Sequence, residues 1–291
     1  MKIAIGLPNA VPGLDGQSLV EFARRADGRG FSSLGTIDRL AYPNYDPLVA
    51  LGAAAAVTER IRLATTVLIT PYRPNATLLG KQTATLDNLS GGRLTLAVGI
   101  GGRADDYEVS GMPTKGRGVT LSRQIEQMQR VWRGEVRGAE AVGPPPSRPG
   151  GPELIMGGGA DAAFERTAKY AAGWMSGGGG PEVFEQGAAR TEAAWKRAGR
   201  DDKPRKLALC QFALGPDAAR DIAQSIKHYY GWLGEYADMI VASVATTEDM
   251  ARQYVEGFAS AGCDELFMFP ASKDPAQVDL LADAVQPDRA G

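Results

Sequence analysis

Short apolar runs alternate with amphipathic stretches along most of the chain. The apolar runs have the length of buried strands, and the stretches between them show the three-to-four-residue spacing of helices packed on one side. Examples of that spacing are Leu19, Phe22, Ala23 and Ala26, and later Leu121, Ile125, Met128 and Trp132. The eight predicted strands cover residues 2–8, 31–38, 61–69, 93–101, 153–158, 173–178, 206–215 and 264–270.

This alternation predicts parallel strands with helices outside them. Eight units without a break favour a closed barrel over an open sheet, so we expect an α/β protein with a single (β/α)8 TIM barrel and short insertions. The chain has 291 residues, and such a barrel needs roughly 250, so one domain over residues 1–291 accounts for the length. Two stretches depart from the regular spacing, the Gly/Pro-rich residues 134–151 and an extra helical stretch over 216–245.

Composition and charge exclude several classes of function. Charged residues make up 23% of the chain, the net charge is -2 and the pI is about 5.7, which provides no field for nucleic acid or an anionic membrane. The first apolar run is too short for a signal peptide or a membrane span. Cys210 and Cys263 lie far apart without metal-binding spacing, so we expect no metal site, no disulfide framework and a cytoplasmic location.

Two glycine clusters follow predicted strands four and five and lead towards helices. Free backbone N–H groups at such turns can hold a phosphate, although a tight strand-to-helix turn explains either cluster equally simply. Neither cluster satisfies a P-loop or the GxGxxG dinucleotide fingerprint. The candidate phosphate-binding residues are Ile100, Gly101, Gly102 and Arg103 after strand four, and Gly157, Gly158, Gly159 and Ala160 after strand five.

Polar side chains also follow predicted strands two and three, where a barrel places its active site. An Asp next to an Arg is either a structural ion pair or part of a catalytic group, and the tyrosines are either reactive or rim packing. The sole histidine, His228, falls on a helical stretch that we expect to be remote, which excludes Ser/His/Asp chemistry and favours chemistry carried by a cofactor. The residues concerned are Asp38, Arg39, Tyr42, Thr65, Thr66 and Tyr72.

The chain resembles the luciferase-like flavin monooxygenases and their deazaflavin-dependent relatives. The resemblance covers nearly the whole chain and is carried by residues 60–101, 116–132, 156–175 and 246–270. It implies a TIM-like barrel with a flavin or deazaflavin ring across the strand ends and its phosphate at the two glycine turns. It also implies a bulge at the end of strand three, where "ATTVL" matches a motif with a cis peptide between Thr66 and Val67 beneath the ring.

The departures from the family pattern narrow the function. Deazaflavin-dependent sugar-phosphate dehydrogenases of this family carry a His and a Glu where this chain has Arg39 and Gly102, so that reaction is not expected. Residues 134–151 replace a longer loop of bacterial luciferases, so light emission is not implied. Because arginine stays charged, Arg39 is expected to stabilise negative charge rather than act as a base, and Arg39→Ala to reduce turnover with the fold intact.

Three functions remain open. The leading one is a monooxygenase that uses reduced FMN and O2 on a small organic substrate, with a separate flavin reductase as a partner, because such chemistry needs a dry pocket more than an acid or base. The second is hydride transfer with coenzyme F420, with Tyr42 or Tyr72 as proton donor. The third is a non-catalytic flavin-binding barrel.

Two further expectations concern surfaces. An aromatic group over residues 229–236, with Tyr229, Tyr230, Trp232 and Tyr236, forms either a wall of the site or ordinary core packing. The resemblance implies a homodimer through the helices flanking strands two and three. The apolar helix expected over 46–58 fits that role, because its small residues permit close packing.

Overall fold

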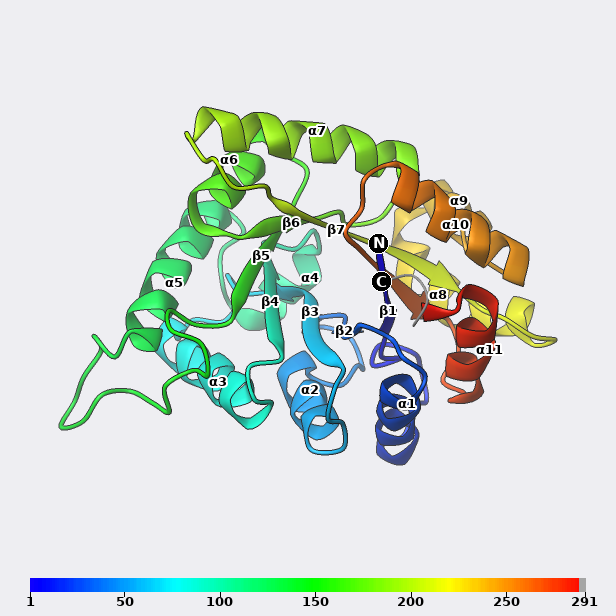
Figure 1. Cartoon of the computed structure of the whole chain (residues 1–291), viewed down its shortest axis with the longest axis horizontal. Coiled ribbons are helices and arrows are strands. Elements are labelled where there is room, and N and C mark those ends of the chain that lie inside the picture. The colour runs from blue at the N-terminus through cyan, green and yellow to red at the C-terminus, as the bar shows by residue number, and fades with distance from the viewer. Residues whose placement is uncertain (288–291) are drawn as a thin grey trace.

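Eight parallel strands close into a barrel in chain order, from β1 to β8, which confirms the predicted fold class. The computed structural model describes residues 1–287, and Figure 1 shows its helices surrounding the strands. Each strand falls within the predicted apolar run or begins one residue before it. The strands are β1 (Lys2–Gly6), β2 (Ser33–Thr36), β3 (Arg62–Ile69), β4 (Leu94–Gly99), β5 (Glu153–Gly157), β6 (Gly173–Met175), β7 (Arg205–Phe212) and β8 (Glu265–Pro270).

Helices connect successive strands, and extra helices follow β4 and β7. The helices that pack around the barrel are α1 (Gly16–Gly28), α2 (Pro47–Ala55), α3 (Ala76–Leu89), α5 (Arg117–Trp132), α6 (Asp161–Tyr170), α7 (Pro181–Arg197), α10 (Glu248–Ser260) and α11 (Ala276–Val285). The additional elements are α4 (Ala104–Ser110), α8 (Ala218–Tyr230), the 3-10 helix η1 (Gly231–Leu233) and α9 (Glu235–Ala242).

Four helices, α1, α2, α3 and α10, begin at a capping side chain. Asp15 accepts a hydrogen bond from the N–H of Ser18, and Asp46 accepts from Leu48 and Val49 at the start of α2. These bonds satisfy N–H groups that the first helical turn leaves without a partner. With Asp46 as its N-cap, α2 begins at Pro47 and ends at Ala55, so it is shorter than the helix expected over 46–58.

Two kinds of apolar core hold the barrel together. Inside it, small and large side chains from most strands form one cluster, including Ala4, Ala64 and Phe267. The alternate residues of the strands, such as Ile3 and Ile5, face outward and pack under the helices. The interior is therefore filled with side chains.

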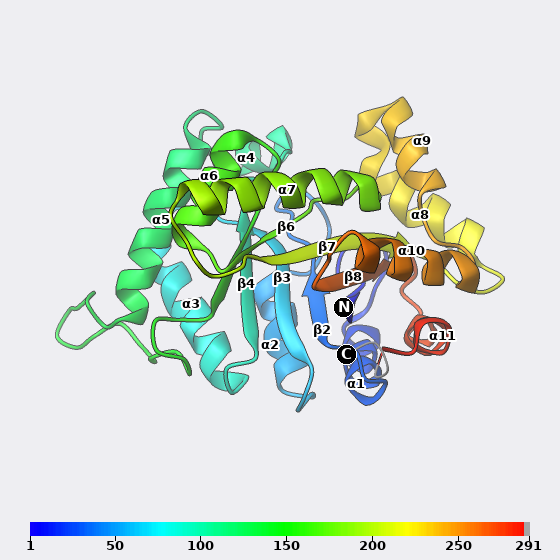
Figure 2. The same cartoon turned by 45° about the horizontal axis from the view of Figure 1, so that its top comes forward.

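Both irregular stretches lie where the spacing predicted them. Residues 134–151 form a long excursion between α5 and β5, and residues 216–245 contain α8, η1 and α9. Figure 2 shows α4, α8 and α9 at the upper edge of the barrel, while the excursion extends from its lower left. Within residues 1–287, no helix is both long and apolar enough to cross a membrane.

Candidate functional site

A cavity of about 430 Å³ lies at the carboxyl ends of the strands. Most of the predicted site residues line it, from the ends of β2, β3, β4 and β5. These are Asp38, Arg39, Thr66, Val67, Ile100, Gly101, Gly102, Arg103, Gly157, Gly158 and Gly159. Four others, Tyr42, Thr65, Tyr72 and Ala160, are not part of its lining.

The end of β3 forms the bulge that the resemblance implied. The strand register shifts between Thr65 and Leu68, and the peptide between Thr66 and Val67 is cis. Thr65 is fully buried and donates its hydroxyl to the carbonyl of Ala97, so it supports the strand pair rather than the cavity. Val67 points over the neighbouring strands, where a Cβ on Gly99 would lie 2.7 Å from its Cγ2. Glycine at the end of β4 therefore makes room for Val67.

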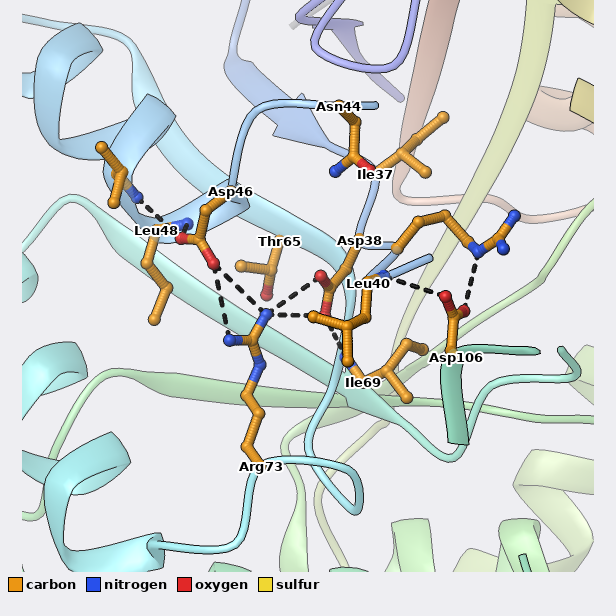
Figure 3. A network of polar contacts seen from close by, with 12 residues as sticks. Ile37, Asp38, Leu40, Asn44, Asp46, Leu48, Thr65, Ile69, Arg73 and Asp106 are labelled. Carbon is orange, nitrogen blue, oxygen red and sulfur yellow. Dashed lines mark hydrogen bonds and ion pairs between the residues drawn. The ribbon is translucent and has the colours of Figure 1, made fainter. Parts of the chain in front are cut away.

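Asp38 is held in a buried polar network. Its Oδ2 accepts the N–H of Ile69 at 2.7 Å, and Nη2 of Arg73 lies 3.0 Å from Oδ1. Arg73 also reaches Asp46, so one guanidinium joins the loop after β2 to the loop after β3 (Figure 3). Burial raises the pKa of Asp38, while the charge of Arg73 and the N–H of Ile69 act in the opposite direction.

Arg39 does not pair with Asp38, its neighbour in sequence, but with two carboxylates of α4. Its Nε donates to Asp106 at 2.7 Å and its Nη2 to Asp105 at 2.8 Å. The side chains of Arg39 and Asp106 are only 3% and 4% exposed. Asp106 also accepts the N–H groups of Leu40 and Ala41, the first of which is drawn in Figure 3. The idea of an ion pair between Asp38 and Arg39 was therefore wrong, because each residue is tied to a partner elsewhere in the chain.

Arg39 lines the cavity and has one donor without a partner. Its Nη1 is buried and has no hydrogen-bond partner among residues 1–287. The guanidinium lies beside the rings of Tyr42 and Tyr229, at 5.6 and 5.7 Å from their centroids. Tyr229 lines the cavity with Tyr230. Burial, then the neighbouring Tyr230, raises the pKa of Tyr229, and Arg39 opposes this. A buried cation with an unused N–H is suited to bind an oxygen of a ligand.

His228 is closer to the site than the sequence suggested. The hydroxyl of Tyr42 lies 2.9 Å from Nδ1 of His228, and the two rings are 5.6 Å apart. The expectation of a remote histidine was therefore wrong, because α8 folds back over the loop after β2. Tyr72, by contrast, is buried in a small cluster with Ile69 and Tyr107 and is not part of the cavity lining. Burial raises the pKa of Tyr72.

The turn after β5 is one of two candidate anion sites, since Gly102 after β4 faces open space as Gly159 does. A Cβ on Gly159 would meet no atom within 4 Å, so the backbone there faces open space at the start of α6. Nη1 of Arg190 donates to the carbonyl of Gly159 at 2.9 Å, and its Nη2 forms an ion pair with Asp161 at 2.7 Å. Acidic side chains lie in the first turn of both helices, Asp105 and Asp106 in α4 and Asp161 in α6, and they offset the positive ends of these helices.

The far wall of the cavity comes from strands that the sequence analysis did not single out. Its residues are Met175 on β6, Ser176 and Gly177 after it, Leu209 and Gln211 on β7, and Phe269 on β8. Phe269 covers Gly6, since a Cβ there would lie 2.1 Å from its ring. The glycines over 177–180 were a usable signal, because they form a third cluster after a predicted strand. Nothing local marks Phe269 or Gln211.

The chain matches the family described as luciferase-like monooxygenase over residues 1–262, and it belongs to that family. Its relatives include two from Mycobacterium tuberculosis. Uncharacterized protein Rv0953c is 35% identical over 173 residues, 56% of this chain and 61% of that protein. Uncharacterized protein Rv0940c is 32% identical over 212 residues, 62% of this chain and 72% of that protein. The match thus spans about three fifths of the length of the first relative.

Solved structures share the fold over almost the whole chain. A monooxygenase, RslO1 from Streptomyces bottropensis, has a TM-score of 0.78 at 21% identity and covers 99% of this chain and 100% of its own. An F420-dependent secondary alcohol dehydrogenase with an F420-acetone adduct has a TM-score of 0.82 at 18% identity, with 99% of each chain covered. The oxygenating constituent of 3,6-diketocamphane monooxygenase from Pseudomonas putida, in complex with FMN, has a TM-score of 0.73 at 17% identity, covering 97% and 96%.

Proposed function

We propose that this protein is a flavin-dependent monooxygenase that uses reduced FMN and O2 to oxygenate a small organic molecule. The observation that carries the proposal is the state of the carboxylates at the cavity. Asp38 is bound by Arg73 and a backbone N–H, and Asp106 by Arg39 and two backbone N–H groups. Neither is free to act as an acid or base, so the protein has to position and shield a cofactor that carries the chemistry.

The described residues fit a flavin-type group at two points. The open backbone at Gly159, next to Arg190 and the start of α6, suits a phosphate. The unused Nη1 of Arg39 suits an oxygen that gains negative charge during the reaction. When bound, reduced FMN would supply the electrons for oxygenation. Val67, Leu209 and Phe269 give the cavity an apolar lining that limits water.

The second candidate is hydride transfer with coenzyme F420, and it is favoured by one observation. The ring of Tyr229 lies on the cavity wall beside Arg39, so its hydroxyl could serve as the proton donor that such a reaction requires. Tyr72 does not fit that role, because it is buried outside the cavity. Tyr42 lies behind Tyr229, with their rings 5.1 Å apart.

Titration of the protein with each cofactor separates these functions. We expect FMN to bind saturably, with a change in its absorbance, and the reduced complex to consume O2 in the presence of substrate. Tighter binding of F420, with hydride transfer and no O2 consumption, would establish the second candidate instead. Saturable binding without turnover in either assay would indicate the non-catalytic barrel. A separate flavin reductase is the expected source of reduced FMN.

The phosphate position is tested by Gly159→Val. The new side chain enters open space without backbone strain, whereas Gly158 has a φ of 140° and its Cβ would lie 2.8 Å from that of Ala163. Gly159→Val should weaken cofactor binding at least tenfold, or about 1.4 kcal/mol. Gly138→Val, in the exposed excursion and equally free of contacts, is the matched control and should bind normally. Normal binding by Gly159→Val would place the phosphate elsewhere.

A further inference from the structure

A second cavity of about 700 Å³ lies at the opposite end of the barrel, where the strands begin. Its lining is strongly basic. Two carboxylates, Glu153 and Asp264, face five cations, which are Lys2, Arg62, Arg148, Lys203 and Arg205. The net charge of the whole chain is -2, so this excess is local and is not visible in the composition.

Two of the five cations are neutralised within the barrel. Arg205 forms ion pairs with Glu153 and Glu265, which are 20% and 1% exposed. Arg62 lies 3.6 Å from Glu153 and donates to the hydroxyl of Thr95 at 2.8 Å. The two arginines and the two glutamates carry two positive and two negative charges, so this group has no net charge.

The remaining three cations have no ion pair within residues 1–287. Lys2 begins β1, Lys203 lies in the loop between α7 and β7, and Arg148 comes from the excursion over 134–151. Three segments far apart in sequence therefore bring unpaired positive charge to one cavity. Asp264, the other carboxylate of the lining, accepts the backbone N–H of Lys206.

The concentration of positive charge at the cavity affects the pKa of Arg62. Burial lowers the pKa of Arg62 and Glu153 opposes the change, but the charges of Arg148 and Arg205 lower it further. Like charges that repel one another across a cavity are stabilised by an anion placed between them.

We propose that this basal cavity binds a small phosphate-bearing anion. Arginine and lysine form charge-assisted hydrogen bonds with phosphate oxygens, and the planar fork of Arg148 can engage two of them. The volume exceeds that needed by a single ion and lies in the range of small-molecule sites, so a phosphorylated metabolite or a diphosphate fits better than a simple halide. The site is separate from the proposed cofactor cavity, which lies at the other end of the strands.

The test is calorimetric titration of the full chain with inorganic pyrophosphate at a fixed ionic strength maintained with NaCl, because salt screens exposed charges. We expect saturable binding that falls at least tenfold in the double variant Arg148→Ala/Lys203→Ala. Both side chains are exposed, so the variant keeps the fold, which its melting temperature checks. Malonate, a dicarboxylate, should bind at least tenfold more weakly than pyrophosphate.

The matched control removes the same charge elsewhere. Arg137→Ala/Lys115→Ala takes one arginine from the same excursion and one lysine from another exposed loop, and it should bind pyrophosphate as the unmodified protein does. If both double variants lost the same pyrophosphate affinity, the anion would be attracted only by the overall positive charge of the surface, and the proposal would be overturned. Unchanged binding in Arg148→Ala/Lys203→Ala would place pyrophosphate at another site, such as the turn after β5, and would also overturn it. Equal affinity for malonate would refute the preference for phosphate.

Discussion

Arg39 has a structural contact and a free donor on the same guanidinium. Its Nε and Nη2 hold Asp106 and Asp105, and its Nη1 remains unpaired beside the cavity. The sequence suggested that Arg39→Ala would leave the fold intact. The structure changes that expectation, because removing one partner of a buried ion pair leaves the other charge without compensation.

We therefore predict that Arg39→Ala lowers the free energy of unfolding by about 3 kcal/mol, near the lower end for buried pairs since Asp106 keeps two backbone N–H partners. Arg39→Lys should recover part of that stability, because it keeps the charge, but should not recover turnover, because an ammonium cannot bind both carboxylates and the cavity at once. Chemical denaturation and steady-state rates measure the two effects.

The control is Arg252→Ala, in an ion pair with Glu248 and Asp249 that is 43% exposed on the arginine side. It should change stability by less than about 1 kcal/mol, as exposed pairs do. If Arg39→Ala were as stable as the unmodified protein, the buried pair would contribute nothing. If Arg39→Lys restored full turnover, the free Nη1 would have no role in the reaction.

At the scale of elements, the packing of α7 on β6 fixes the turn after β5. The indole of Trp174 lies between Phe164 and Phe184, and its Nε1 donates to the carbonyl of Gly158 at 2.9 Å. Gly187 on α7 allows this contact, because a Cβ there would lie 2.2 Å from the indole. Glycine at position 187 is thus required for Trp174 to contact α7 and to bind the carbonyl of Gly158 in the turn after β5.

We predict that Gly187→Ala destabilises the protein, although alanine is the better helix former. The gain in helix propensity is about 1 kcal/mol, while forcing a methyl group into a packed core costs about 1–3 kcal/mol, and the anchored indole has little room to move. Gly52→Ala on α2, where a Cβ meets nothing within 4 Å, should instead stabilise by up to about 1 kcal/mol. Thermal and chemical denaturation show whether each variant is more or less stable than the unmodified protein.

Cofactor titration of the same pair adds a functional measurement. Gly187→Ala should weaken cofactor binding, because a displaced indole shifts Gly158, and Gly52→Ala should not. Gains in stability for both variants would mean that α7 moves away from Trp174 without penalty.

At the scale of the whole molecule, exposed apolar side chains lie on the helices flanking β3. Val49 on α2 is 72% exposed and Leu78 on α3 is 49% exposed, and the two helices pack against each other. These helices are where the family resemblance implied a homodimer. Covering such side chains would remove apolar surface from water.

We predict that light scattering gives about twice the 30.7 kDa chain mass at micromolar concentration, and that Val49→Asp shifts the mass to that of a monomer. Val183→Asp on α7, at a position that is 54% exposed, is the matched control and should leave the dimer intact. A monomeric unmodified protein would contradict the prediction, and dissociation by both variants would show that the surface is not specific.

Local pattern was sufficient to predict part of the candidate site. The glycine turns after β4 and β5 could be found because they follow strands directly, and the barrel then places all strand ends together. Asp38 and Arg39 were found for the same reason. Their partners were not, since Arg73 and Asp106 are 35 and 67 residues away in sequence, and adjacency suggested a pair that the backbone geometry does not make.

The sequence by itself determined the order of strands and helices, because the period of apolar positions is a property of each segment alone. It also determined the starts of α1, α2, α3 and α10, where a capping side chain lies within three residues of its partner. Only the tertiary structure decided which charges are neutralised. Closure of the barrel brings Tyr42 to His228 and gathers Lys2, Arg148 and Lys203 at one end. Such contacts depend on distances across the molecule, which no local period encodes.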